Sequence, residues 1–281
     1  NTSVIVNVPT VVTGAYKTQY YLTVSNGGHG TASGEGWYDS GVLAPFSISP
    51  TTVFEGVGTR YVFTQWSGDS SSANPSDTIL MNSPKTVTAN WKTQYHVTFT
   101  QTGSGATVHV NYTADTDPTV EVPFSTWVKA GSTLTFSYEV IVRDGQPTRY
   151  VRVSVNQTSP VIVNSPVTIT ATYKTQHYLT VGHLPVDTIL DGHQTGQDYY
   201  NADYTATVTA DLYVNITAGA SRYTFDHWSG DASGTSTTTT VVMSAPKTAT
   251  ANYKTQYYIT VTSAHDIPTP SAWVDAGSDF A

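Results

Sequence analysis

The chain has 281 residues, of which 38% are hydrophobic and only 11% are charged, and its formal net charge is -8. Globular proteins average about 25% charged residues, so uncharged polar side chains must cover most of this surface. The lack of Lys and Arg clusters argues against nucleic acid as a partner. The absence of Cys excludes disulfides and thiolate metal sites, and no apolar run is long enough for a membrane span.

A phrase that begins Lys-Thr-Gln recurs along the chain and divides it. We interpret its lysines as the joints between repeated units: Lys17, Lys92, Lys174 and Lys254. The repeat predicts three whole units, called units one, two and three, at 17–91, 92–173 and 174–253. Residues 1–16 would be the closing hairpin of a preceding or partner-completed unit, and 254–281 the opening strands of an incomplete one.

Further phrases recur at fixed places between the joints. A closing phrase such as SPKTVTANW (83–91) precedes each joint, and an aromatic phrase follows each opening strand: GWYDSG (36–41), TWVKAG (126–131), QDYYNAD (197–203) and AWVDAG (272–277). Units one and three share RYVFTQWSGD (60–69) and RYTFDHWSGD (222–231). Unit two has RYVRVSVNQT (149–158) there and lacks the WSGD.

Side-chain alternation predicts what the units are made of. Val97 and Phe99 alternate with polar residues, which is the period of a half-buried strand. Pro84 at the start of the closing phrase favours a turn that makes a hairpin with the preceding strand. No segment shows helical spacing. We therefore predict an all-β chain of tandem small antiparallel β-sandwich units, Ig-like or β-grasp-like, arranged as closely coupled beads in series, with these tryptophans in the structural core: Trp66, Trp91 and Trp228.

Together, KTQYYLTV, GWYDSG, TRYVFTQWSGD and MNSPKTVTANW resemble the divergent internalin-B-type repeat, also called the bacterial repeat domain. The resemblance covers units one and three well and unit two in part, and the KTQYYLTV wording is similar to archaeal secreted proteins. It implies an extracellular or cell-surface stalk, adhesin, surface-layer or fibre component and no catalysis. Unit two departs from the family pattern where it lacks the WSGD loop.

No catalytic constellation emerges from the residues, so we expect no enzyme, no catalytic residue, no metal and no cofactor. Asp69 and Asp231 after Trp-Ser-Gly are candidate Ca²⁺ ligands, but a Gly-Asp turn that carries a core Trp is the favoured interpretation. The exposed tyrosines of the repeated strand, Tyr21, Tyr178 and Tyr258, would either stack on sugars or a neighbouring subunit or, as we favour, pair across strands.

Four Asn-X-Ser/Thr sequons make surface glycans candidate modifications and partners: Asn1, Asn111, Asn156 and Asn215. The leading functional hypothesis is a structural subunit of an extracellular filament or pilus-like fibre. The alternative is a stalk or a carbohydrate- or surface-binding repeat array of a larger secreted adhesin or enzyme, and an enzyme in its own right comes third.

The terminal segments bear on assembly. Residues 1–16 and 254–281 would both expose unpaired strand edges, which favour pairing with another chain. One hypothesis is a homo-polymer in which the terminal hairpin of one subunit supplies strands to the incomplete unit of the next, head to tail. The other is that the sequence is a fragment of a longer repeat protein.

Overall fold

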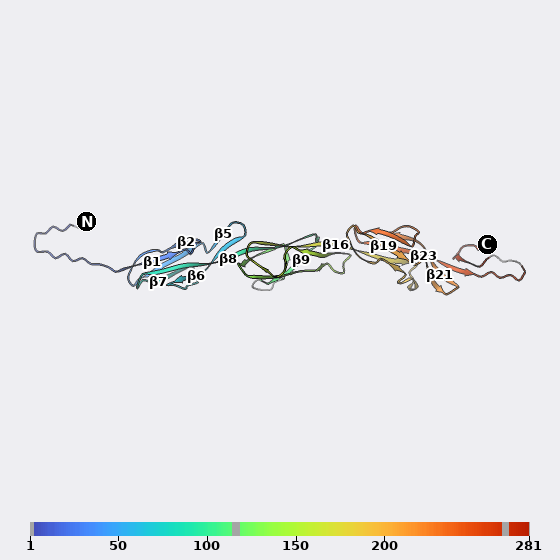
Figure 1. The fold of residues 1–281 in the computed structure, drawn as a ribbon, viewed down its shortest axis with the longest axis horizontal. Helices are drawn as coiled ribbons and strands as arrows, with labels where there is room; N and C mark the ends of the chain where they lie inside the picture. Colours follow the sequence, from blue (N-terminus) through green and yellow to red (C-terminus); the bar gives the residue numbers. More distant parts are fainter. Residues whose placement is uncertain (1–2, 114–118, 266–269, 281) are drawn as a thin grey trace.

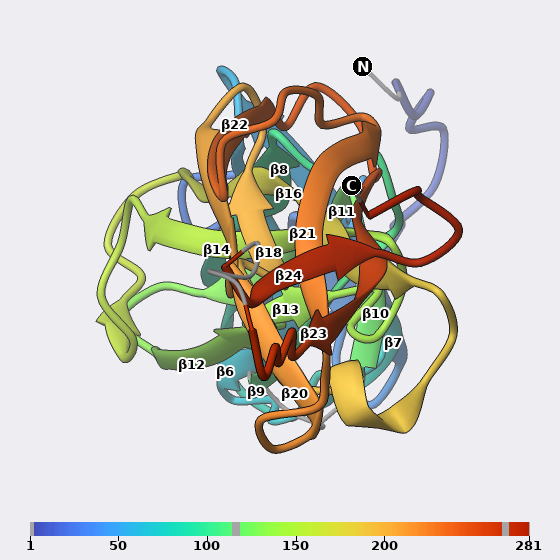
Figure 2. The ribbon, with the colours of Figure 1, turned by 90° about the vertical axis from the view of Figure 1, so that its right-hand side faces the viewer.

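The computed structural model describes residues 3–113, 119–265 and 270–280. In that part the chain is all β, with a single short 3-10 turn, η1 (Thr188–Leu190). Figure 1 shows the units lying one after another in a row, with the N-terminal segment extended at one end. The end-on view superposes them in a compact outline (Figure 2). The predicted all-β beads in series are confirmed.

Unit one is a sandwich of two sheets. The larger sheet has the order β3-β1-β8-β6-β5 and the smaller β2-β4-β7. The bounds are β1 Gln19–Ser25, β2 Thr31–Ser33, β3 Gly36–Asp39, β4 Leu43–Ser49, β5 Thr52–Glu55, β6 Thr59–Gly68, β7 Ser76–Leu80 and β8 Lys85–Thr102. Leu22, Phe46 and Trp66 fill the space between the sheets.

Unit two repeats this plan. Its larger sheet has the order β11-β8-β16-β14-β13, and its second layer contains β10-β9-β12-β15. The bounds are β9 Val108–Thr113, β10 Thr119–Val122, β11 Phe124–Lys129, β12 Thr133–Tyr138, β13 Ile141–Val142, β14 Thr148–Val155, β15 Val161–Ile162 and β16 Val167–Leu184. Its core includes Phe99, Leu134 and Ile169.

Unit three has β18-β16-β23-β21-β20 as its larger sheet and β17-β19-β22 as its smaller one. Beyond it, β24 pairs with the end of β23. The bounds are β17 Gln194–Thr195, β18 Asp198–Asn201, β19 Thr205–Ala210, β20 Tyr213–Thr217, β21 Ser221–Gly230, β22 Thr238–Val242, β23 Lys247–Ile259 and β24 Ala272–Asp275. Its core includes Leu179, Trp228 and Met243.

The strands β8, β16 and β23 run through the joints without a break. The first half of each closes one unit and the second half opens the next, so fourteen strands of the described part of the chain belong to one hydrogen-bonded sheet. One face of each strand serves two cores. Val87 on β8 is buried in unit one, and Val97 on the same face is buried in unit two. Because no loop intervenes, adjacent units are coupled through a continuous backbone.

The first and last strands of each unit lie side by side in parallel. Leu22–Ser25 pairs with Lys85–Thr88, and the same offset from the joint lysines recurs in the two later pairings, β8 with β16 and β16 with β23. Among the described residues all other strand pairs are antiparallel. The predicted hairpin at Pro84 is wrong, because β7 pairs with β4 in the smaller sheet whereas β8 lies in the larger one.

Residues 3–18 form no strand, although a closing hairpin was expected over 1–16. Their apolar side chains are exposed: Val12 is 72% and Tyr16 is 97% exposed. Counted from the joint lysine, Val12 corresponds to Val87, which is fully buried. This N-terminal segment (residues 3–16) therefore has the sequence of a closing strand but no sheet to lie in among the described residues.

Candidate functional site

The joints between units repeat the same set of side-chain contacts along the chain. Lys92, Lys174 and Lys254 lie inside the through-running strands, and Lys17 precedes β1. At the last three joints an arginine strand of the preceding unit pairs antiparallel with the Lys-Thr-Gln phrase, so that the arginine faces the glutamine. The arginine strand thus contributes to its own unit and to the joint.

Each of these three arginines binds the same two groups. The Nε of Arg60 donates to Oε1 of Gln94 at 2.8 Å, and its guanidinium lies 4.5 Å from the Trp127 ring centroid in the next unit. The later joints repeat this arrangement with Arg149, Gln176 and Tyr199 (2.9 and 3.6 Å) and with Arg222, Gln256 and Trp273 (2.9 and 4.2 Å). An arginine is thereby clamped between a carboxamide and an aromatic face.

The first joint also has a glutamine and an aromatic ring, Gln19 and Trp37, at the positions that hold an arginine in the later joints. Gln19 donates from Nε2 to Asp39 at 2.9 Å, as Gln256 does to Asp275 at 2.8 Å. Gln19 and Lys17 both hold the pKa of Asp39 below its usual range, with the hydrogen bond from Gln19 the larger cause. Trp37 occupies the position of Trp127 and is 66% exposed.

The tyrosines of the repeated strand pair across strands. Tyr21 meets Trp37 edge-on at 5.3 Å between ring centroids, and Tyr178 meets Tyr199 at 4.8 Å. Tyr258 and Trp273 lie 5.3 Å apart, and His96 takes the tyrosine position opposite Trp127 at 5.0 Å. These rings therefore line the joints on the outer side of the sheet.

The WSGD loops anchor a core tryptophan. Trp66 is fully buried and donates from Nε1 to the Asn74 carbonyl at 3.0 Å. Trp228 is 2% exposed and donates to the Ser236 carbonyl at 3.1 Å. Trp91 is half-buried against the core of unit one and donates to the Asn26 carbonyl.

The loop aspartates are held by hydrogen-bond donors. Asp231 accepts the Thr248 amide at 2.8 Å and the Lys247 ammonium at 2.9 Å, and these two groups lower its pKa. Asp69 accepts the Thr86 amide at 2.7 Å and Lys85 at 3.5 Å. Both oxygens of each carboxylate thus fasten the end of the tryptophan strand to the closing strand, which matches the turn interpretation.

In unit two Asn156 makes the corresponding hydrogen bonds to the closing strand. Its Oδ1 accepts the Thr170 amide at 2.8 Å, and its Nδ2 donates to the Thr168 carbonyl at 3.0 Å. The backbone amide of Asn156 also bonds Thr170, as that of Asp69 bonds Thr86. Asn156 therefore replaces the loop aspartate, and its predicted glycan would attach to a nitrogen that already makes a structural bond.

The other sequons lie in different settings. Asn111 on β9 and Asn215 on β20 are exposed. Asn1 lies outside the described residues. The glycan assignments remain predictions.

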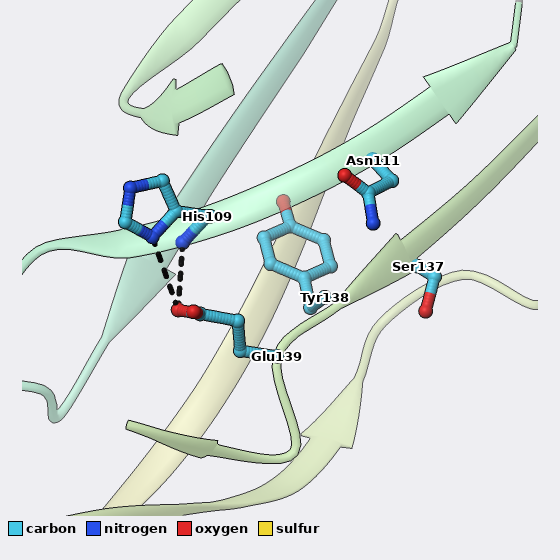
Figure 3. A pocket seen from close by; sticks show the side chains of 5 residues that line it. All are labelled: His109, Asn111, Ser137, Tyr138 and Glu139. Carbon is cyan, nitrogen blue, oxygen red and sulfur yellow. Dashed lines mark hydrogen bonds and ion pairs between the residues drawn. The ribbon is translucent and has the colours of Figure 1, made fainter. Parts of the chain in front are cut away.

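Unit two also contains a surface pocket of about 430 Å³ (Figure 3), which sequence reasoning did not identify. His109 and Glu139 face each other there, with Nδ1 3.4 Å from Oε2, and Asn111 and Ser137 lie beside them. The Tyr138 hydroxyl donates to the Ile169 carbonyl, and burial raises its pKa, so it stays a neutral donor to the backbone. Within residues 3–113, 119–265 and 270–280, no three His, Asp or Glu side chains gather in a way that could hold a metal ion.

Sequence reasoning identified Lys-Thr-Gln as a joint but missed the arginines. The signal was available, because an Arg-Tyr phrase precedes each later glutamine, by 34 residues in units one and three and by 27 in unit two. The looser QDYYNAD phrase made Tyr199, the aromatic partner of Arg149, hard to recognise.

Comparison with known proteins identifies a family. The family model described as the divergent InlB B-repeat domain matches residues 20–94 and 186–256, which together make up more than half of the chain. Neither the curated proteins nor the solved structures yield a match. No helix long and apolar enough to cross a bilayer occurs in the part of the chain that the structure describes.

Proposed function

Because the chain belongs to the divergent InlB B-repeat family, we propose that it is a structural subunit of an extracellular filament, polymerised head to tail by strand donation. The N-terminal segment of one subunit would add a strand to the unit that opens at Lys254 in the next. The family assignment gives a tandem surface-type repeat. The filament and the strand donation go beyond the family assignment and are the content of the proposal.

The observation that carries the proposal is a matched pair of uncovered faces. Ile259 takes the place of Leu22, Val97 and Leu179, which are all fully buried, yet Ile259 is only half-buried. At the other end Val12 is 72% exposed where its counterpart Val87 is fully buried. Each face lacks the kind of neighbour that the other could supply.

The three parallel pairings set the register of the donated strand. In each unit the residue five after the opening lysine faces the residue seven before the closing lysine. Applied between subunits, this rule places Ile259 opposite Thr10 and Val261 opposite Val12. The buried pair Val24 and Val87 is the counterpart of the second contact. A head-to-tail contact of this kind does not close on itself and so builds an open fibre.

Negative-stain microscopy of the purified chain tests the proposal. We expect regular filaments from the full chain and none after deletion of residues 1–16. Val12→Asp should abolish them as well, because it places a charge in the donated core face. Val11→Asp is the matched control, because its counterpart Thr86 is exposed. Filaments that survive both the deletion and Val12→Asp, or a full chain that forms none, would contradict the proposal.

A further inference from the structure

Three joints hold an arginine in the same clamp, and the first joint presents the same clamp without one. The glutamine Oε1 accepts the arginine Nε at every later joint. Gln19 has its Nε2 fixed on Asp39 in the same way, and no hydrogen bond to its Oε1 occurs within the described residues. The acceptor is therefore oriented before any arginine is present.

The aromatic half of the clamp is also ready. Trp37 is 66% exposed, whereas Trp127, Tyr199 and Trp273 are half-buried under their arginines. Its ring is fixed by the edge-on contact with Tyr21. A large exposed aromatic face held in place suits a cation, and the adjacent Asp39 carboxylate already pairs with Lys17 at 3.0 Å.

The strand edge beside the clamp is open as well. β1 pairs with β3 over Gln19–Leu22, and on its other edge with β8 over Leu22–Ser25 only. In β8 and β16 the corresponding stretch of that second edge is taken by the arginine strand of the preceding unit. Within the described residues no strand takes this place beside residues 17–21. An antiparallel strand fits there with main-chain hydrogen bonds.

We propose that the surface formed by residues 17–21 and Trp37, called the Gln19–Trp37 surface, docks the arginine-bearing strand of a further repeat unit of this kind, since the three arginine strands described above are already held at their own joints. Its arginine lies opposite Gln19 and over Trp37, and the tyrosine that follows lies opposite Thr18. The occupant is argued from three filled copies of the same interface, β6 on β8, β14 on β16 and β21 on β23.

The inference goes beyond strand donation, because the N-terminal segment contains no arginine and cannot fill the clamp itself. The two interactions also use different residues. Donation buries Val12 in a neighbour, whereas docking covers Trp37.

The test inserts a copy of residues 174–253 between Tyr16 and Lys17 of the full chain. The inserted Tyr253 then precedes Lys17 as it precedes Lys254 in the native chain, and the inserted Arg222 comes into register with Gln19. Hydroxyl-radical footprinting with mass spectrometry measures the oxidation of Trp37. We expect it to fall from the rate of an exposed ring to that of Trp127, and Arg222→Ala in the inserted copy to restore it.

Oxidation of Trp37 that is unchanged by the insertion, or equally reduced with the alanine, would overturn the proposal. So would protection of Trp37 by maltohexaose but not by the inserted unit, which would assign the surface to a sugar. If the inserted chain does not fold, a peptide of residues 58–66 is added to the unmodified chain. Slower amide exchange at residues 18–21 supports docking, and unchanged exchange contradicts it. None of these readouts depends on filaments.

Discussion

The guanidinium of Arg149 lies 3.6 Å from the ring centroid of Tyr199, although the first residue belongs to unit two and the second to unit three. The same guanidinium donates to Gln176 in the strand that joins the two units. One side chain thus contacts the end of one unit, the joint and the beginning of the next. Because an arginine makes these contacts at three joints, side chains as well as the backbone couple each unit to the segment that follows it.

Removing this arginine should weaken the coupling of units two and three. Arg149→Ala loses the contact with Tyr199 and the bond to Gln176, and we expect a loss of about 1 kcal/mol in the free energy of unfolding. Denaturant unfolding of the full chain measures it. Arg149→Lys keeps the charge but lacks the planar guanidinium, so its free energy of unfolding should lie between those of the native chain and Arg149→Ala. An unchanged transition for Arg149→Ala would show that the backbone alone couples the units.

The buried tryptophan of unit one should be the most sensitive core position. Trp66→Ala leaves a cavity and an unpaired Asn74 carbonyl, and should cost about 3–5 kcal/mol. The control is Trp37→Ala, since Trp37 is 66% exposed and its loss should cost less than about 1 kcal/mol. Thermal unfolding compares the two variants. Equal effects would contradict the assignment of Trp66 as the centre of the core.

The glycine of the WSGD loop has no room for a side chain. Gly68 has a φ of +92°, and an added Cβ would lie 2.4 Å from the Thr86 carbonyl oxygen. Gly68→Ala should therefore destabilise unit one by roughly 1–3 kcal/mol. Gly182 in β16 has open space around its Cα and no positive φ, so Gly182→Ala should be neutral or stabilising by up to about 1 kcal/mol. Chemical denaturation of both variants checks the contrast, and a tolerated Gly68→Ala would refute it.

Acid should loosen the third unit through Asp231. The Thr248 amide and Lys247 lower the pKa of this carboxyl in the folded chain, whereas an unfolded Asp has a pKa of about 3.9. The stabilisation is therefore complete above about pH 4 and is lost as the pH falls through the lowered folded value. In Asp231→Asn the free energy of unfolding should depend less on pH below about pH 4 than it does in the native chain. An identical acid profile for the variant and the native chain would contradict this assignment.

Much of the fold could be predicted because the repeat and the alternation are written in the sequence. Val87 and Ala89 in the closing phrase face the core, as their spacing indicated. The parallel pairing of first and last strands could not, because alternation tells which face is buried and not which strand lies alongside. For the same reason the turn at Pro84 was mistaken for a hairpin when it crosses between sheets.

The side-chain contacts at the joints could be predicted from the sequence only in part. Lys-Thr-Gln marked the boundary, but the contact of Arg60 with Gln94 depends on a strand from 34 residues earlier folding back across the joint. Asn156 was visible only as a sequon. Its role as a replacement for the loop aspartate follows from hydrogen bonds to Thr168 and Thr170, which no spacing rule reveals.

Cysteine cross-linking tests the central claim of strand donation most directly, because the chain has no native Cys. A Val12→Cys chain is mixed with a Val261→Cys chain and oxidised, so that a mixed disulfide can form only between subunits. Adjacent strands lie about 4.8 Å apart, within the Cα range of a disulfide of about 4.4–6.8 Å.

On a non-reducing gel we predict covalent dimers from the pair Val12→Cys and Val261→Cys. The pair Val11→Cys and Val261→Cys should give few, because side chain 11 points to the opposite face of the donated strand. Absence of the first dimer, or equal yields from both pairs, would contradict the head-to-tail register.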